Sequence, residues 1–251
     1  MIAFISDLHS NMEAIHAVLD DIERRGIERI ICLGDVIGYG PEPVAALRMV
    51  DQWEACLRGN HEEAVLYVAE DFNDKARAAL DWTRDQLNDA SLPREDRYAL
   101  WGILGDHMKV EHRIDTALLV HGSPRDPIRE YMLPRDVRDT QKMRECFDKM
   151  DRPACFVGHS HVPGVYPQSG GFLPPSECPD GYTLRPGEKA IINAGSVGQP
   201  RDGDNRASYC SWDGETVFFH RVPYDYETTM KKILKSGGLP RYLADRLKVG
   251  R

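Results

Sequence analysis

Short apolar runs, each followed at once by polar residues suited to metal binding, are the feature that most constrains how this sequence folds. Runs at 2–5, 29–33, 53–57, 117–120 and 154–157 are too short for buried helices and have the length of buried β-strands. The polar residues that follow them are Asp7, His9, Asp35, Asn60, His61, His121, His159 and His161. Because strand ends form the ligand crevice of open α/β sheets, we expect these side chains to meet at one edge.

The first thirty residues predict a parallel sheet. Apolar residues at helical spacing separate the first two strands, and the pattern ends at Gly26. Strand, helix and strand in this order form a βαβ unit with a right-handed crossover. After residue 162, short β-like runs alternate with turn residues, and Asp213-Gly214 predicts a hairpin. The sequence therefore predicts one α/β domain over 1–251 whose second half is antiparallel.

Two helical stretches accompany this domain. Residues at about 62–110 read as two or three helices, and residues at about 225–248 as a helical tail. The first stretch either completes the core or forms a cap that selects the substrate, and the sequence alone leaves both alternatives open.

Composition and charge exclude several classes of protein. The net charge of −8 disfavours an extended nucleic-acid surface or a membrane-surface binder. The six cysteines form no C-x-x-C pair, which disfavours a zinc site or a disulfide framework. No apolar run approaches the length of a membrane span, and no secretory signal opens the chain. We therefore expect a cytoplasmic protein with no membrane partner.

The polar residues at the strand ends favour a metal centre. Imidazole, carboxylate and amide oxygen together suit Mn, Fe, Zn, Ni or Mg, of which we favour Mn or Fe. The ligands are too many for one ion, so two divalent ions bridged by one carboxylate use them better. A lone histidine is more often a packed core residue, but this many in one pattern favour the metal. If the backbone is extended at Asp7/His9 and His159/His161, each pair points one way.

The order of these residues resembles the signature of a known superfamily. Asp7-x-His9, Gly34-Asp35, Gly59-Asn60-His61-Glu62, His121 and Gly158-His159-x-His161 are similar to the calcineurin-like metallophosphoesterases. Residues 193–201 also resemble its small bacterial phosphodiesterase branch. The resemblance implies an α/β fold in which two central mixed β-sheets are flanked by helices, as a four-layer α/β/β/α sandwich.

The resemblance also implies roles for the residues. Asp35 would bridge two ions, of which the first is held by Asp7, His9 and His161 and the second by Asn60, His121 and His159. His61 would bind no metal and would act on the leaving-group oxygen or stabilise the transition state. Arg201 and Arg206 are candidates for binding the substrate phosphate. We read Glu62 as the beginning of a helix, where an acidic residue complements the helix dipole.

These roles predict a dinuclear metal-dependent phosphoesterase that acts on a small phosphate ester by attack of a metal-bridging hydroxide. Protein phosphatases and diadenosine tetraphosphatases of the superfamily have an arginine soon after the Gly-Asp motif. This chain has Val36-Ile37-Gly38-Tyr39 instead, which removes a phosphate contact and argues against those two activities, and we expect a phosphodiesterase. The alternatives are a phosphomonoesterase acting on nucleotides or phosphoproteins and a non-catalytic scaffold of the same fold. Tyr39 is a candidate to stack on a substrate base.

Overall fold

Two β-sheets packed face to face form the centre of the protein. The computed structural model describes residues 1–68 and 72–251. One sheet has the order β3-β2-β1-β10-β11-β8, with β1 (Ile2–Ile5), β2 (Arg29–Cys32), β3 (Ala55–Cys56), β8 (Tyr182–Thr183), β10 (Ala207–Trp212) and β11 (Thr216–Val222). The other has the order β4-β5-β6-β9-β7, with β4 (Glu111–Ile114), β5 (Ala117–Val120), β6 (Ala154–Val157), β7 (Gly164–Pro167) and β9 (Ala190–Asn193).

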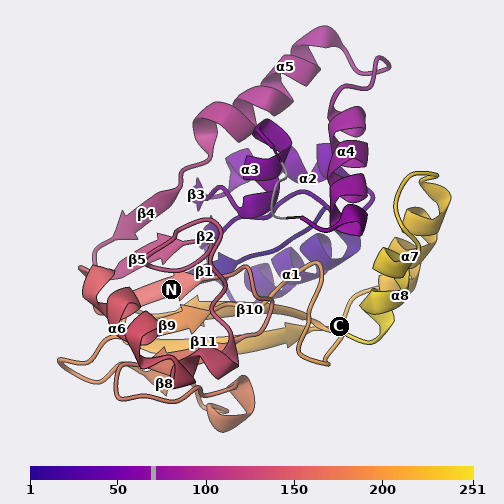
Figure 1. The fold of residues 1–251 in the computed structure, drawn as a ribbon. Coiled ribbons are helices and arrows are strands. Elements are labelled where there is room, and N and C mark those ends of the chain that lie inside the picture. The colour runs from indigo at the N-terminus through magenta and orange to yellow at the C-terminus, as the bar shows by residue number, and fades with distance from the viewer. Residues whose placement is uncertain (69–71) are drawn as a thin grey trace.

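Helices cover the outer face of each sheet. Helices α1 (Met12–Arg24) and α2 (Pro43–Leu47) pack on the six-stranded sheet, and α6 (Thr140–Lys149) packs on the five-stranded one. Figure 1 shows α1 and α6 outside the two sheets. This arrangement confirms the predicted fold of two mixed sheets flanked by helices.

Strand β1 illustrates why apolar runs become central strands. Its four residues are all buried, with Ala3 and Ile5 facing the helices and Ile2 and Phe4 facing the other sheet. The Phe4 ring stacks on Phe156 of β6 with centroids 3.9 Å apart, which joins the two sheets. Burial on both faces therefore explains a run without polar alternation.

The second half of the chain departs from the prediction at one strand. Strands β7, β8, β10 and β11 make antiparallel pairs, but β9 runs parallel to β6. The expectation of an entirely antiparallel second half is therefore wrong. Ala190, Ile191 and Ile192 are buried in a continuous apolar run, which is typical of an interior parallel strand.

The two predicted helical stretches contain helices that lie side by side. Between the sheets' strands β3 and β4 the chain forms α3 (Asn60–Leu66), α4 (Asp74–Leu87), α5 (Arg94–Gly102) and η2 (Ile103–His107), and the C-terminal segment forms α7 (Tyr226–Lys235), α8 (Tyr242–Asp245) and η5 (Arg246–Lys248). Shorter 3-10 turns are η1 (Val50–Gln52), η3 (Pro134–Arg138) and η4 (Pro175–Glu177). Ala79 of α4 packs in one apolar cluster with Ile233 and Leu243, and Figure 1 shows α7 and α8 beside α4. The division into domains stays a prediction.

Candidate metal centre

The ends of strands from both sheets bring the predicted residues together. Asp7 and His9 follow β1, and Asp35 follows β2. His121 follows β5, and His159 with His161 follows β6. Two buried groups result, in each of which the potential ligand atoms lie within 4.8 Å of one another: Asp7, His9, Asp35 and His161, and Asp35, His121 and His159.

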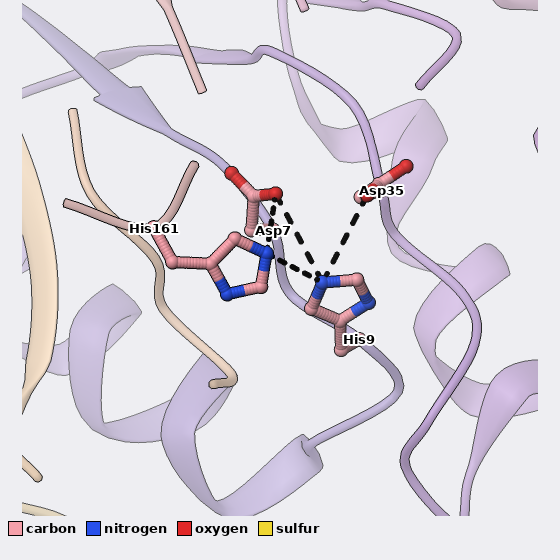
Figure 2. Close-up of side chains that lie close together, drawn as sticks. All are labelled: Asp7, His9, Asp35 and His161. Carbon is pink, nitrogen blue, oxygen red and sulfur yellow. Dashed lines mark hydrogen bonds and ion pairs between the residues drawn. The ribbon is translucent and has the colours of Figure 1, made fainter. Parts of the chain in front are cut away.

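The first group is arranged around the Asp7 carboxylate. His161 Nε2 lies 3.0 Å from Asp7 Oδ1, and His9 Nε2 lies 3.9 Å from the same atom. The two imidazole Nε2 atoms are 3.2 Å apart, and His9 Nε2 is 3.8 Å from Asp35 Oδ2. Figure 2 shows the two rings turned toward each other and toward the carboxylates.

The second group shares Asp35 with the first. His121 Nε2 lies 3.4 Å from Asp35 Oδ2 and 3.2 Å from His159 Nδ1. Asn60, the first residue of α3, places its Oδ1 3.2 Å from His121 Nε2. Asp35 therefore occupies the position between two ligand sets that a bridging carboxylate needs.

Backbone carbonyls fix the orientation of all four histidine rings. His9 Nδ1 is 3.2 Å from Ile37 O, and His121 Nδ1 is 3.0 Å from Leu33 O. The remaining two contacts are His159 Nε2 to Arg129 O and His161 Nδ1 to Gln199 O. A carbonyl only accepts hydrogen bonds, so each outer nitrogen carries the proton and each inner nitrogen of a neutral ring carries a lone pair. Metal-binding histidines are held in this way.

Burial and the two carboxylates determine the charges in the site. Burial raises the pKa of Asp7 and Asp35, but the neighbouring histidines lower it further, so both pKa values lie below the ordinary range. Burial lowers the pKa of His9, and lowers that of His159 to about 3. Burial also lowers the pKa of His121, but Asp35 raises it more, to about 9. The carboxylates are therefore ionised and favour positive charge between them.

These features fit divalent ions. Inner nitrogens face each other at 3.2 Å in both histidine pairs, and a cation that displaces the proton of His121 would be shared by both members of a pair. Asp7 Oδ1 is buried, and the inner nitrogen of His161 lies 3.0 Å from it, so the carboxylate and the imidazole could ligate the same ion. The donor set of imidazole, carboxylate and amide oxygen contains no thiolate, since all six cysteines are buried free thiols elsewhere.

The backbone at the candidate ligands is left-handed rather than extended. Asp7, His9, Asp35, His159 and His161 have φ between 47° and 64°. The pairs Asp7/His9 and His159/His161 therefore converge through left-handed turns, and the condition of an extended backbone, under which each pair would point one way, is not met. Each such non-glycine residue costs roughly 1–2 kcal/mol, which the surrounding structure must offset.

Glycine is needed where the backbone passes against a candidate ligand. A Cβ on Gly59 would lie 2.1 Å from Asp35 Oδ1, and one on Gly158 would lie 2.6 Å from Asp7 Oδ2. Both carboxylates thus rest directly on a neighbouring main chain. His61 N donates to Asp35 Oδ1 at 2.9 Å and His159 N donates to Asp7 Oδ2 at 3.0 Å, which fixes them further.

His61 lies beside the two groups and belongs to neither. Its Nε2 is 4.0 Å from Asp35 Oδ2, and the residue is 2% exposed. Tyr39 and Phe72 meet its ring edge to face, with centroids 4.3 and 5.1 Å away. Burial lowers the pKa of His61 to about 4, with the charge of Arg201 acting in the same direction and Asp35 opposing.

Glu62 is a structural residue of the site whose role the sequence reading missed. It lies in the first turn of α3, as expected, but its carboxylate is fully buried and accepts three backbone hydrogen bonds. The donors are Asp35 N at 2.9 Å, Gly59 N at 2.8 Å and Ile37 N at 3.1 Å. Glutamate three residues after the helix cap is the capping-box pattern, and that signal could have identified it.

Comparison with known proteins agrees with this geometry. The sequence profile of the calcineurin-like phosphoesterase superfamily domain matches residues 1–216. The chain belongs to this superfamily. An uncharacterized protein of Methanocaldococcus jannaschii is 38% identical over 259 residues, covering 100% of this chain and 98% of that protein.

Two solved structures have the same architecture. A metallophosphoesterase from Sphaerobacter thermophilus has 35% identity and a TM-score of 0.80, covering 100% of this chain and 98% of the other. A hypothetical protein from Pyrococcus horikoshii has 20% identity and a TM-score of 0.74, covering 100% and 99%. The calcineurin-like phosphoesterases are metal-dependent hydrolases of phosphoric esters, and the buried aspartate and histidine groups of this chain could bind metals.

The two arginines proposed as phosphate contacts lie in different environments. Arg201 is half-buried, its Cζ is 5.7 Å from the centroid of Tyr39, and its Nη2 donates to Gln199 at 2.9 Å. Arg206 is exposed and pairs with Asp204 at 2.6 Å. The structure thus brings Arg201 close to the site and directs Arg206 to a surface pair.

No helix within residues 1–68 and 72–251 is long and apolar enough to cross a membrane.

Proposed function

We propose that this calcineurin-like phosphoesterase is a dinuclear metal-dependent phosphodiesterase that hydrolyses a small phosphate ester. The observation that carries the proposal is the pair of facing imidazole nitrogens on each side of Asp35. His9 and His161 supply one pair and His121 and His159 the other, each 3.2 Å apart. Asp7 and Asn60 complete the two sets, and we favour manganese or iron as the metal.

The ions and the protein have separate tasks in this proposal. When bound, two divalent ions polarise phosphate oxygens and lower the pKa of water so that it can attack phosphorus. Asp35 holds the two ligand sets together, because its Oδ2 faces His9 and His121 while its Oδ1 is fixed by the His61 backbone. The carbonyl contacts of the histidines keep their inner nitrogens aligned without rearrangement.

His61 and Arg201 act on the ester itself. Burial lowers the pKa of His61 to about 4, so it is neutral at pH 7 in the free site; the negative charge of a bound phosphate ester would favour its protonated form. From that form His61 passes a proton to the leaving oxygen, which helps an alkoxide most because its conjugate acid is weak. Arg201 binds a phosphate oxygen with its guanidinium. The preference for diesters is supported by Val36 and Ile37, which follow Asp35 and are buried in the apolar core, so neither offers a cation to the additional charge of a monoester.

Metal content and substrate preference test the proposal. Manganese-loaded protein should contain two ions per chain and turn over bis(p-nitrophenyl) phosphate faster than p-nitrophenyl phosphate. One ion per chain contradicts the dinuclear site, and a preference for the monoester favours a phosphomonoesterase. A chain that binds no metal and turns over neither ester is a scaffold.

His61→Ala tests the proton donor separately. The variant should keep two ions per chain but lose about 10²–10⁴-fold in turnover of a cyclic nucleotide, whose leaving group is an alkoxide. The loss with bis(p-nitrophenyl) phosphate should be much smaller, since nitrophenolate leaves without a proton. Equal losses on both substrates contradict the role of His61 as an acid.

A further inference from the structure

A small cavity opens beside the candidate metal centre. It has a volume of about 160 Å³, and Asn60 and His159, both predicted metal ligands, form part of its wall. Sites for drug-sized ligands typically occupy about 300–1,000 Å³, so this cavity fits one small group. A phosphate ester held at the metals would extend one substituent into it.

Aromatic rings form much of the cavity wall. Tyr39, Phe72 and Tyr131 all line it. The Tyr131 ring lies flat on the ring of His159, with centroids 3.7 Å apart and planes at 16°. Tyr131 nevertheless remains 42% exposed and lines the cavity. A planar group entering the cavity would therefore meet an aromatic side chain there.

A guanidinium lies close to one of these rings. The Nε of Arg201 is buried and has no hydrogen-bond partner among the described residues. The Cζ of Arg201 lies 5.7 Å from the ring centroid of Tyr39, which lines the cavity together with Tyr131. An anion bound by Arg201 beside Tyr39 and a ring lying on Tyr131 would be the two parts of one aryl ester of phosphate.

We propose that this cavity binds a planar ring carried by the substrate, with Tyr131 as its stacking surface. The substrate class is then phosphate esters with a small aryl or heteroaryl group. The inference rests on the proposed function, because the metal centre is what places the phosphorus next to the cavity. Tyr131 determines specificity and takes no part in bond cleavage.

Two phosphonates test the cavity without a leaving group. Phenylphosphonate and methylphosphonate carry the same anion and are not hydrolysed, and both are measured as inhibitors of bis(p-nitrophenyl) phosphate hydrolysis by the manganese-loaded protein. We expect phenylphosphonate to bind about tenfold more tightly, the effect of one aromatic contact. Tyr131→Ala should reduce this ratio to near one without changing inhibition by methylphosphonate. Tyr131→Phe should keep the ratio.

Controls separate the possible failures. Tyr98→Ala removes an exposed tyrosine of α5 that does not line the cavity and should keep the wild-type ratio. A ratio near one in the wild type, or one that survives Tyr131→Ala, overturns the inference and leaves the proposed function standing. If Tyr131→Ala loses both its bound metal and its inhibition by methylphosphonate, Tyr131 only supports His159. That outcome also overturns the inference. If the wild type hydrolyses nothing, the proposed function fails, and calorimetric titration of the two phosphonates still tests the cavity.

Discussion

Removing the Glu62 carboxylate should destabilise the protein and weaken its metal centre. In Glu62→Ala three buried N–H groups lose their acceptor, those of Asp35, Ile37 and Gly59. Each buried donor without a partner costs about 1–3 kcal/mol, so the sum is about 3–9 kcal/mol. Burial and the charge of Asp35 raise the pKa of Glu62 to about 7, so a buried charged carboxylate is unfavourable at this position. Removing it recovers that cost and offsets part of the lost hydrogen bonding. We expect a net decrease of about 3 kcal/mol in the free energy of unfolding.

Glu62→Gln should have a smaller effect. The amide oxygen can still accept from Asp35 N and Gly59 N, which share Oε2, while its NH₂ group faces Ile37 N. One unsatisfied donor costs about 1–3 kcal/mol, so this variant should lie between the wild type and Glu62→Ala. Glu63→Ala is the matched control, since the Glu63 carboxylate makes a 3.5 Å contact with Arg58 and should contribute less than about 1 kcal/mol.

Urea unfolding in EDTA measures these differences without the contribution of bound metal. Calorimetry should also show about 10–100-fold weaker manganese binding by Glu62→Ala, because Glu62 holds the backbone on which Asp35 sits. If Glu62→Ala and Glu63→Ala change the free energy of unfolding equally, or Glu62→Ala binds manganese like the wild type, the backbone-holding role is refuted.

Two further predictions concern the same centre. Manganese at a hundred times its Kd should stabilise the folded chain by about 2.7 kcal/mol per site. EDTA should therefore lower the midpoint of thermal unfolding, and added manganese should restore it. A midpoint that neither EDTA nor manganese changes argues against a resident metal. Gly59→Ala should weaken manganese binding at least tenfold, because the new Cβ would lie 2.1 Å from Asp35 Oδ1, whereas Gly102→Ala in α5 meets nothing within 4 Å and should bind normally. Equal binding by both glycine variants would show that the Asp35 contact is not restrictive.

The sequence predicts which side chains meet, because a strand end is a position that can be read from a short apolar run. Asp35 and His121 lie in different sheets, yet each follows such a run and they come within 3.4 Å. Their role as ligands stays a prediction. The backbone conformation at these residues could not be predicted from the sequence, because positive φ at Asp7 or His9 depends on the packing of neighbouring loops.

Other features depend on contacts between distant segments. The partners of Glu62 include main-chain groups 25 and 27 residues away, so its position in a helix could be predicted but its contacts could not. Arg201 and Arg206 lie in one polar loop, so the sequence does not distinguish their environments. They differ in the structure because the Arg206 guanidinium donates a hydrogen bond to Asp204. Strand β4 was not predicted, since its residues 111–114 are largely polar and pair along one side only, at the edge of the sheet.

The place of β1 between β2 and β10 has a consequence for biosynthesis. Phe4 is translated before its register partner Cys210, which is made roughly 200 residues later, after about 10–40 s of translation. Throughout that interval the nascent chain carries an apolar strand with one unpaired edge, a form open to aggregation. Yield in a heterologous host should therefore depend on how well chaperones shield that edge until β10 emerges.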